Sequence, residues 1–338
     1  ETGILTHNGP LVIEFEKRLE EMWGVRNVVA VSNGTMAIQL ALRALDIRGE
    51  VITTPFTWQA TATAIAWEGC VVKFSEICPD SLCLDPLCVM EDMTEKTGAI
   101  MPVNVYGNPP DFKAFEELTK STGVPVIYDA AHSAFTTLDG VSSLSFGDIS
   151  ATSFHATKLI NTGEGGACVT NNDDLAERLR ALRFFGFYSD GSLDKFGTNA
   201  KMTEVNAAIG LCCLDNIDFI LQRRAEIARS YENHLLGIDR IQIHRPKVGG
   251  FVTNNLYFPV LFENEEILLK VEDSLKTQDV YPRRYFYPSL NEVGIFDKNA
   301  FPISEDYATR ILCLPIHTEM SVEDSEKVVQ IIAKAIEL

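Results

Sequence analysis

Basic residues are scarce in this sequence. Its 338 residues include 29 lysines and arginines against 47 aspartates and glutamates, which gives a formal net charge of -18. Contacts to a nucleic acid need clustered basic side chains, and the basic runs here stop at the pairs Arg223-Arg224 and Arg283-Arg284. The composition therefore excludes nucleic acid as a major partner. A small anionic ligand stays possible, because one local positive pocket can persist inside a negative field.

Long hydrophobic runs and metal-binding cysteine patterns are also missing. No stretch of 18 or more apolar residues occurs, which argues against a membrane span. The eight cysteines form no C-x-x-C pair and have no histidine at metal-ligand spacing, so we expect no metal site. Cysteines inside apolar runs, as at 166–169, are typical of buried thiols in a reducing compartment. This favours a cytoplasmic location.

Neither repeats nor low-complexity segments occur. Hydrophobic residues make up 46% and charged residues 22% of the chain, close to the average for globular proteins, so disorder is not expected. The length allows two domains. The chain starts at Glu1 without the basic start and apolar run of a signal peptide, and we expect its natural N-terminus to have been trimmed.

Short runs rich in Val and Ile alternate with helical patterns between residues 25 and 171. The runs that we expect to be strands are 28–31, 51–53, 99–103, 126–128 and 167–169. Such strands between amphipathic helices are typical of a mostly parallel sheet that is covered on both faces. The pattern predicts an α/β domain, in which ligands bind beyond the carboxyl ends of the strands.

The pattern changes in the last third of the chain, after a predicted long helix from about 202 to 236. Residues 251–262 and 311–315 are predicted strands, and residues 265–278 and 322–336 are predicted helices. Ser321 and Asp324 open the last helix in a near-match to a capping box. We therefore expect a large domain over residues 1–235 and a smaller α+β domain over residues 236–338.

Small polar residues follow the first predicted strand and open a helix, in the order Ser32, Asn33, Gly34 and Thr35. Backbone N–H groups at a helix N-terminus can bind an anion, because they point outward and the helix dipole favours negative charge there. The alternative is an ordinary helix cap formed by Ser32 or Asn33. The segment matches neither G-x-G-x-x-G nor a Walker loop.

Asp129 and Lys158 follow two further strands. Asp129 comes directly after residues 126–128, with His132 three positions later; the alternative is a helix-capping aspartate beside a buried histidine. Lys158 lies between Ser153, His155 and a glycine-rich turn, where burial would lower its pKa and make the amine nucleophilic. Most lysines are only solvated charges, but this one shares a sheet edge with an anion pocket and an acid.

These three features together suit pyridoxal phosphate. That cofactor needs a phosphate site, a carboxylate for its ring nitrogen and a lysine amine for its aldehyde. Trp58, which follows the predicted strand 51–53, adds a flat aromatic side chain that could stack on such a ring.

Several segments resemble the DegT/DnrJ/EryC1/StrS family of pyridoxal-phosphate-dependent nucleotide-sugar aminotransferases. They are residues 5–10, 32–35, 54–58, 129–132, 153–158 with 163–166, and 199–204, which together span almost the whole chain. The resemblance implies the fold type I of pyridoxal-phosphate-dependent transferases, similar to aspartate aminotransferase, with a large mostly parallel sheet domain. It also implies a homodimer in which each active site lies at the subunit interface.

The resemblance further implies roles for four cofactor-contacting residues. Lys158 would form the aldimine with the cofactor and then carry the proton during tautomerisation. Asp129 would pair with the ring nitrogen, Trp58 would stack on the ring, and His132 would lie near the phenolic oxygen.

The phosphate of the cofactor would be held by Gly34, Thr35 and Ser153, joined by Asn199 from the second subunit. His155 is expected to line the same cavity and orient the substrate. One departure concerns this region, because Ala200-Lys201 replaces the aromatic residue and arginine that are usual after the asparagine.

Arg283, Arg284 and Tyr285 are implied to contact the diphosphate or the hexose of the substrate. A pair of arginines suits an anionic ligand, since the guanidinium group matches the geometry of phosphate. The alternative is an exposed basic turn.

The function implied is a transaminase that takes an amino group from L-glutamate, through the pyridoxamine form of the cofactor. The acceptor would be the keto group of a nucleotide-linked 6-deoxyhexose. Residues 54–61 and 154–159 look most like enzymes that make dTDP-4-amino-4,6-dideoxyglucose, so C4 of a dTDP-sugar is expected. Amination at C3 of a 3-keto sugar and a UDP-linked substrate are the alternatives.

Two other functions are alternatives to transamination. Sugar dehydratases of the same family carry histidine in place of the lysine, so Lys158 argues against that activity. A sensor that binds pyridoxal phosphate or a nucleotide-sugar without turnover is the alternative from another class. Lipopolysaccharide O-antigen biosynthesis follows as the setting only by analogy.

Overall fold

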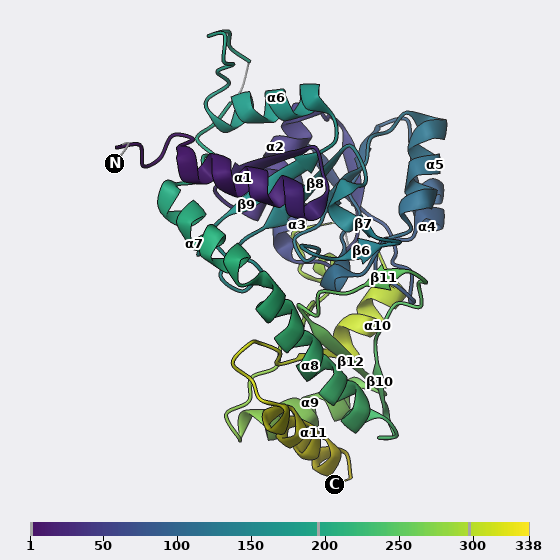
Figure 1. Cartoon of the computed structure of the whole chain (residues 1–338). Coiled ribbons are helices and arrows are strands. Elements are labelled where there is room, and N and C mark those ends of the chain that lie inside the picture. Colours follow the sequence, from purple (N-terminus) through teal and green to yellow (C-terminus); the bar gives the residue numbers. More distant parts are fainter. Residues whose placement is uncertain (1–2, 195–196, 297–298, 338) are drawn as a thin grey trace.

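The computed structural model describes residues 3–194, 197–296 and 299–337. Figure 1 shows two halves that are joined by a long helix, with the purple to teal segments in the upper half and most green to yellow segments in the lower half. The N-terminus lies on the upper half and the C-terminus on the lower half.

A mostly parallel sheet forms the centre of the upper half. Its four-stranded part has the order β1 (Asn27–Val31), β9 (Gly166–Thr170), β8 (Ile149–Ser153) and β5 (Ile127–Asp129). Its three-stranded part has the order β3 (Val71–Phe74), β2 (Glu50–Thr53) and β4 (Thr97–Ile100). Parallel bridges from Ile100 to Val126 and from Val103 to Asp129 connect the two parts. Strand β9 is antiparallel to both of its neighbours, whereas the other pairings are parallel.

Helices cover both faces of this sheet. Alternate residues of β1 point to opposite faces, so that Val28 and Ala30 pack in one hydrophobic cluster and Val29 and Val31 in another. The first cluster includes side chains of α1 (Pro10–Trp23), α5 (Phe112–Thr122) and α7 (Glu204–Asp215). The second includes side chains of α2 (Gly34–Ala44), α3 (Gln59–Trp67) and α6 (Asp173–Arg183). Burial on both faces explains why the strands are almost continuously apolar.

A three-stranded antiparallel sheet forms the lower half. Its strands are β10 (Ile241–Ile243), β12 (Phe258–Phe262) and β13 (Ile311–Leu314), with β12 in the middle. The surrounding helices are α9 (Glu265–Lys276), α10 (Pro302–Arg310) and α11 (Val322–Glu337). The expected capping box is confirmed, because the Ser321 N–H donates to Asp324 Oδ2 at 3.0 Å and the Asp324 N–H donates to Ser321 Oγ at 3.1 Å.

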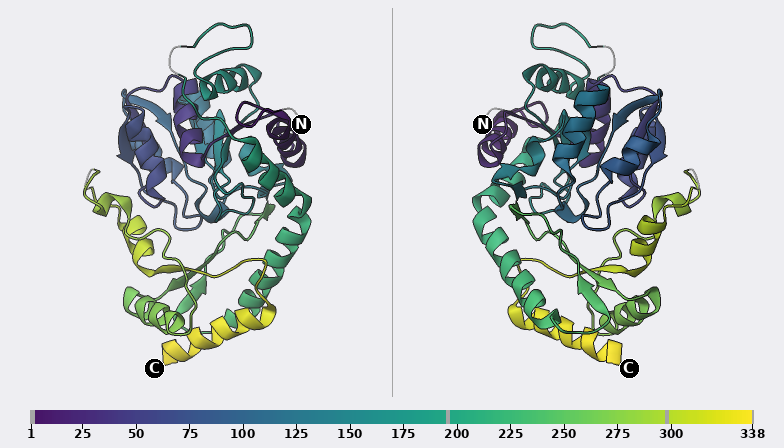
Figure 2. Two further views of the ribbon diagram at one scale, coloured as in Figure 1. Left: turned by 90° about the vertical axis from the view of Figure 1, so that its left-hand side faces the viewer. Right: turned by 90° about the vertical axis from the view of Figure 1, so that its right-hand side faces the viewer.

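The predicted helix from 202 to 236 is two helices, α7 and α8 (Ile217–Leu235), which meet at Asn216. Asn216 has φ -113° and ψ 11°, and its side-chain amide donates to the Cys212 carbonyl at 2.8 Å. Asparagine competes for backbone hydrogen bonds in this way and therefore favours helix ends. Helix α8 supplies Ile217 to the upper core and Tyr231 to the lower core, and Figures 1 and 2 show it running from one half to the other. The domain boundary at residue 235 stays a prediction.

The predicted strand 251–262 is also interrupted. It consists of β11 (Phe251–Val252) and β12, and β11 pairs with the hairpin of β6 (Thr137–Leu138) and β7 (Val141–Ser142) in the upper half. Between them Asn255 has φ 50°, and the Asn254 amide donates to the carbonyls of His132 and Ala134, both at 2.8 Å. The break thus ties this segment to the loop after β5.

The remaining described elements are short. They are α4 (Pro86–Asp92) and 3-10 turns at Val105–Gly107, Ser143–Ser145 and Leu290–Glu292. Among the described residues, no helix has both the length and the apolar character needed to cross a membrane.

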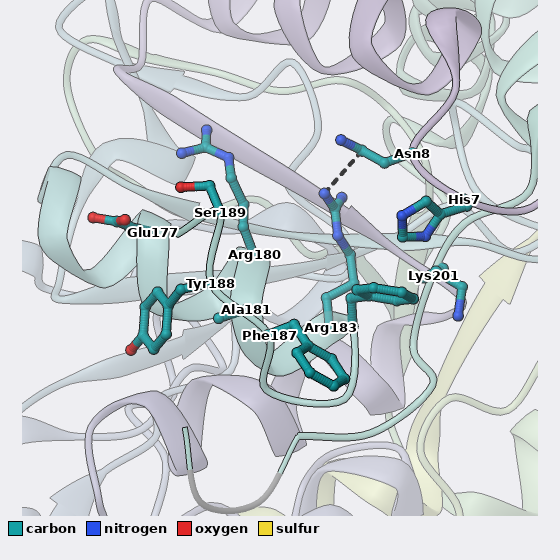
Figure 3. A pocket seen from close by; sticks show the side chains of 11 residues that line it. His7, Asn8, Glu177, Arg180, Ala181, Arg183, Phe187, Tyr188, Ser189 and Lys201 are labelled. Atoms are coloured by element: carbon teal, nitrogen blue, oxygen red, sulfur yellow. Dashed lines mark hydrogen bonds between the residues drawn. The ribbon is translucent and has the colours of Figure 1, made fainter. Parts of the chain in front are cut away.

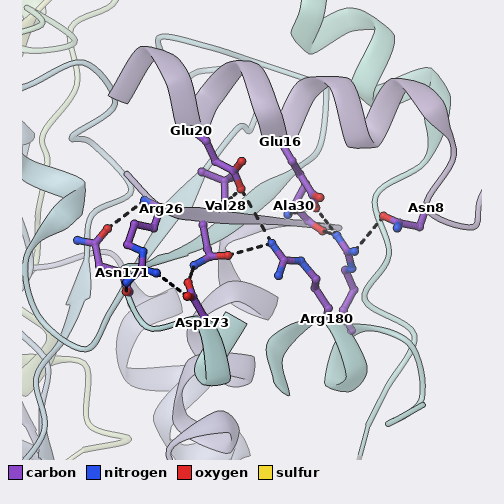
Figure 4. Close-up of polar contacts among 11 residues, drawn as sticks. Asn8, Glu16, Glu20, Arg26, Val28, Ala30, Asn171, Asp173 and Arg180 are labelled. Atoms are coloured by element: carbon purple, nitrogen blue, oxygen red, sulfur yellow. Dashed lines mark hydrogen bonds and ion pairs between the residues drawn. The ribbon is translucent and has the colours of Figure 1, made fainter. Parts of the chain in front are cut away.

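A buried ion pair fastens α1 and α6 to β1. Arg183 donates through Nη1 to Glu16 Oε1 at 2.5 Å and to the Ala30 carbonyl at 2.7 Å, and through Nη2 to Asn8 Oδ1 at 2.9 Å. Glu16 Oε1 also accepts the Ala30 N–H at 2.8 Å. Arg183 is 4% exposed and Glu16 is 8% exposed. Figure 4 labels Asn8, Glu16 and Ala30 of this network, together with a more exposed network around Arg26.

We predict that Arg183→Met lowers the free energy of unfolding by about 3–5 kcal/mol, because it leaves the Glu16 carboxylate buried without its cation. Arg26→Met is the matched control. Arg26 pairs with Asp173 at 2.5 Å with both side chains more than 60% exposed, so the loss should stay below about 1 kcal/mol. Urea unfolding followed by circular dichroism measures both. Equal losses in the two variants would contradict a special role of the buried pair.

Candidate active site

A cavity of about 720 Å³ opens beyond the carboxyl ends of β1, β2, β5 and β8. Its walls include Gly34, Asp129 and Lys158 from the upper half and Tyr257, Arg283 and Tyr285 from the segments that follow α8. The residues that the sequence places after different strands are therefore brought together at one edge of the sheet. The cavity also lies between the two halves of the chain.

The N-terminus of α2 forms one wall. Asn33 caps this helix by accepting the Met36 N–H at 2.8 Å, while Gly34 and Thr35 line the cavity. A Cβ atom on Gly34 would lie 2.9 Å from the Cβ of Ser153, and one on Gly166 would lie 2.6 Å from the carbonyl carbon of Asn33. Glycine at both positions lets the helix end approach β8 and β9 closely. Gly34, Thr35 and Ser153 line this space together, and the first N–H groups of a helix have no acceptor within the helix.

Asp129 is the last residue of β5 and is only 6% exposed. Its Oδ2 accepts the hydroxyl of Thr61 at 2.7 Å, and its Oδ1 accepts the Ala131 N–H at 3.2 Å. Burial raises the pKa of Asp129, while the two hydrogen bonds and the positive charge of Lys158 act in the opposite direction. The carboxylate is thus fixed in orientation and faces a cation.

Lys158 lies in the tight turn after β8, where its backbone N–H donates to the His155 carbonyl at 2.8 Å. Burial lowers the pKa of the Lys158 amine to about 8, although the negative charge of Asp129 works against this shift. The side-chain nitrogen lies 5.9 Å from the centre of the Tyr257 ring. An appreciable fraction of this amine is therefore neutral near pH 7.5.

His132 is buried beside these groups. Its Nδ1 accepts the Tyr106 N–H at 3.2 Å, so hydrogen bonding assigns the proton of the neutral ring to Nε2. Burial, and to a lesser degree the charge of Lys158, hold the pKa of His132 well below its usual value. The ring is a neutral hydrogen-bond donor that lines the cavity.

Tyr257 and Asn254 also belong to the site, although neither is expected there from the sequence. The Tyr257 ring packs at 4.8 Å from the His132 ring and at 5.5 Å from the Tyr285 ring, and its segment is held in place by the two hydrogen bonds of Asn254. The available signal is the pair of asparagines inside an otherwise apolar predicted strand. Such residues favour a break, and here the break turns toward the site.

An aromatic pair closes one side of the cavity. Trp58 precedes α3 and is 56% exposed, and its ring meets the Tyr285 ring edge to face at 6.1 Å and 77°. Both residues line the cavity. Stacking of Trp58 on a cofactor ring stays a prediction.

The two predicted substrate arginines differ in position. Arg283 lines the cavity, and among the described residues its side chain forms no ion pair. Arg284 does not line the cavity. Its Nη2 donates to Glu265 Oε1 at 2.7 Å and to the Thr309 carbonyl at 2.9 Å, and its guanidinium lies 3.5 Å from the centre of the Tyr287 ring. Arg284 is thus held within the lower half.

Asn199 is exposed and lies outside the cavity of its own chain. Its Oδ1 accepts a hydrogen bond from the amine of Lys201, which also lies 4.9 Å from the Phe184 ring and 4.8 Å from the Phe185 ring. Lys201 lines a second cavity of about 430 Å³ together with residues of α6 and of the N-terminal segment, among them His7 (Figure 3). A contact of Asn199 with a cofactor would therefore have to be made in another subunit.

The first cavity fits pyridoxal phosphate. Gly34 lets the N-terminus of α2 approach Ser153 closely, so that both line the cavity and together offer N–H and hydroxyl donors to a phosphate. A buried carboxylate and an amine of lowered pKa face the same cavity, as Asp129 and Lys158. The donors present therefore match a phosphate, a ring nitrogen and an aldehyde.

Comparisons with known proteins agree over almost the whole chain. The model of the DegT/DnrJ/EryC1/StrS aminotransferase family matches residues 1–333. The dTDP-4-amino-4,6-dideoxy-D-glucose transaminase of Shigella dysenteriae is 40% identical over 337 residues, which cover 97% of this chain and 90% of that protein.

Solved structures agree as well. The structure of DesI with its TDP-sugar product has a TM-score of 0.93 at 35% identity, covering 98% of this chain and 86% of DesI. The S. venezuelae DesV structure in complex with a ketimine intermediate has a TM-score of 0.90 at 28% identity, covering 100% of this chain and 92% of DesV. These matches confirm the expected fold and family resemblance.

We predict that Lys158 of the cofactor-free chain reacts with acetic anhydride with a half-maximal rate near pH 8, because burial stabilises its neutral form. An ordinary lysine would titrate at about pH 10.4. Peptide mass spectrometry after brief labelling across a pH series measures this.

Asp129→Asn is the informative variant for this titration. It removes the negative charge that raises the pKa of Lys158, so the midpoint should move to lower pH. An unchanged midpoint in this variant, or a wild-type midpoint above pH 10, would refute the assigned charge balance.

Proposed function

The chain belongs to the DegT/DnrJ/EryC1/StrS aminotransferase family, and we propose that it transfers the amino group of L-glutamate to C4 of a dTDP-linked 4-keto-6-deoxyhexose. Enzymes of this family depend on pyridoxal phosphate. One observation carries the proposal: the Lys158 amine, whose pKa is lowered, lines the same cavity as the buried carboxylate of Asp129. The choice of sugar is supported by the 40% identity to a dTDP-4-amino-4,6-dideoxy-D-glucose transaminase.

Lys158 is the residue that can move protons in this cavity. When bound, pyridoxal phosphate draws electrons from the reacting carbon and carries the amino group between the two substrates. Lys158 would hold the cofactor and, once its amine is free, take the proton from the donor carbon and return one to the sugar carbon. Burial lowers the pKa of this amine to about 8, so that both its neutral and its protonated form are accessible near neutral pH.

Three other groups would orient the cofactor. Asp129 would keep a proton at the ring nitrogen, since Thr61 and Ala131 already fix the two carboxylate oxygens. His132 would donate its Nε2–H to the phenolic oxygen, as its Nδ1 is engaged by Tyr106. The N-terminus of α2 and Ser153 would hold the phosphate.

Arg283 is the residue that we assign to the diphosphate of the sugar nucleotide. It reaches the cavity from the segment after α9, and no described carboxylate pairs with it. A guanidinium group offers parallel donors that match phosphate oxygens. We leave Arg284 out of this role because Glu265 and Tyr287 already engage it.

The functional unit that we propose is a homodimer in which Asn199 of each chain reaches the cofactor phosphate of the other. Two features support this. Asn199 is exposed and does not line its own cavity, and Phe185 and Phe187, which follow its bridge partner Phe184, are exposed as well. Exposed apolar groups of this size mark surfaces that other proteins cover.

We predict that the pyridoxal-phosphate-loaded enzyme aminates dTDP-4-keto-6-deoxyglucose with L-glutamate, and that NMR places the new amino group at C4. The 3-keto isomer is the matched comparison substrate, and the UDP-linked 4-keto sugar tests the nucleotide. Preference for the 3-keto isomer would reassign the reaction to C3. Binding of the sugars without glutamate-dependent turnover of any of them would instead favour a sensor.

We further predict that Arg283→Gln raises the KM for the sugar nucleotide about 10- to 100-fold, as expected for losing a hydrogen bond to a charged group. Arg284→Gln is the matched control, and it should change this KM less than about twofold while lowering the thermal midpoint, since it breaks the pair with Glu265. Steady-state kinetics and thermal unfolding measure the two effects. A larger KM change for Arg284→Gln would reverse the assignment.

A further inference from the structure

Two polar side chains at the rim of the cavity take no part in the cofactor binding or proton transfer described above. His155 and Glu164 lie beyond the ends of β8 and β9, and both line the cavity. His155 Nε2 is 3.7 Å from Glu164 Oε1. Of the two carboxylates that line the cavity among the described residues, Asp129 is engaged by Thr61 and Ala131, which leaves Glu164 for a ligand.

The backbone holds these two side chains opposite each other. The ladder between β8 and β9 continues past the strands, because the Phe154 N–H donates to the Gly165 carbonyl at 2.8 Å and the Ala156 N–H donates to the Gly163 carbonyl at 2.9 Å. Each side chain sits between two of these bonded residues. Their separation is therefore set by a paired backbone rather than by a free loop.

The hydrogen bonds of His155 determine what it offers to a ligand. Its Nδ1 accepts the Thr157 backbone N–H at 3.2 Å and lies 2.9 Å from the Thr157 hydroxyl. Because Nδ1 is an acceptor, the proton of the neutral ring is on Nε2, which faces Glu164. The rim thus presents an N–H donor next to a carboxylate acceptor.

The two groups do not bond to each other directly, so a third group that lies beside them can reach both. A nitrogen–oxygen distance of 3.7 Å exceeds that of a direct hydrogen bond, which is about 2.7–3.2 Å. A group that accepts from His155 and donates to Glu164 would satisfy both, and a hydroxyl does both at once. A phosphate or carboxylate would be repelled by Glu164, and an ammonium group has no lone pair for the His155 N–H.

We propose that His155 and Glu164 together bind one ring hydroxyl of the sugar, the one on C3 next to the reacting carbon; this rests on the proposed function. A 4-keto-6-deoxyhexose linked through C1 has two free hydroxyls, on C2 and C3. His155 belongs to the same tight turn as Lys158, since its carbonyl accepts the Lys158 N–H at 2.8 Å. The hydroxyl nearest to the reacting carbon therefore fits this pair.

The pair also favours one orientation of the substrate in the cavity. Glu164 contributes a negative charge on the β8–β9 side, while Arg283 contributes a positive charge from the segment after α9. The diphosphate is drawn to Arg283 and kept from Glu164, which leaves the hexose on the side of His155. Glu164 thus selects both a hydroxyl and the orientation of the substrate.

The test is calorimetric binding of two probes to the pyridoxal-phosphate-loaded enzyme, dTDP-6-deoxyglucose and its 3-deoxy analogue. Neither reacts, so binding is measured apart from turnover. We expect Glu164→Ala and His155→Ala each to weaken binding of the parent sugar about 10- to 100-fold. For the 3-deoxy analogue, the variants and the wild type should agree within about threefold.

Glu326→Ala is the matched control. Glu326 faces His234 Nε2 at 3.6 Å, an exposed pair of the same kind between α11 and α8, and it does not line the cavity. This variant should bind both probes like the wild type. A similar loss in Glu326→Ala would show a general effect of charge and overturn the inference.

The other outcomes are equally clear. Equal weakening of both probes by Glu164→Ala overturns the hydroxyl contact, and so does absence of binding of either probe to the wild type. The 2-deoxy analogue tests which hydroxyl is bound. If the variants weaken binding of the 3-deoxy analogue but not of the 2-deoxy analogue, the assignment to C3 is overturned. The expected binding pattern in an enzyme that aminates no 4-keto sugar would contradict the proposed function and leave the hydroxyl contact supported.

Discussion

The opposition between burial and charge at Lys158 is the interaction on which the rest of the site depends. Burial lowers the pKa of the amine, and the negative charge of Asp129 raises it. Their balance leaves the pKa at about 8, close to the pH at which both forms are needed. That balance requires Asp129 to stay ionised although it is buried, and the donors from Thr61 and Ala131 make this possible. The hydrogen bonds to Asp129 therefore influence the pKa of Lys158 indirectly, because they stabilise the carboxylate that faces it.

The sheet topology explains how much of this site could be predicted from the sequence. Parallel strands bring their carboxyl ends to one edge, so Gly34, Asp129 and Lys158 could be placed together once the strands before them were recognised. The small residues after β1 could be recognised as an anion pocket. The need for glycine, however, comes from tertiary contacts. A Cβ on Gly166 would strike Asn33, more than 130 positions away in the chain, and no local pattern contains that contact.

The positions of Tyr257, Arg283 and Arg284 could not be predicted from the sequence, because they depend on contacts between segments that lie far apart in the chain. Tyr257 follows a predicted strand pattern, yet the amide of Asn254 bonds to the loop after β5 and turns the segment toward His132. Arg283 and Arg284 are equivalent in sequence, but pairing of Arg283 with Cys313 across β13 sends the neighbouring side chain toward Glu265. Alternation along an extended segment decides which arginine faces the cavity, and it can be read only when the partner strand is known.

The charges that line the cavity differ from the net charge of the chain. The net charge of -18 describes the surface, whereas the cavity combines Lys158, Arg283 and a helix N-terminus against Asp129 and Glu164. Asp129 is buried at the end of β5 and Glu164 is exposed at the rim, so the two carboxylates act on different parts of a ligand. A substrate with a diphosphate at one end and hydroxyls at the other experiences attraction at Arg283 and selection at Glu164. An acidic protein can therefore bind an anion in one orientation, because its negative charges at this site repel the wrong end.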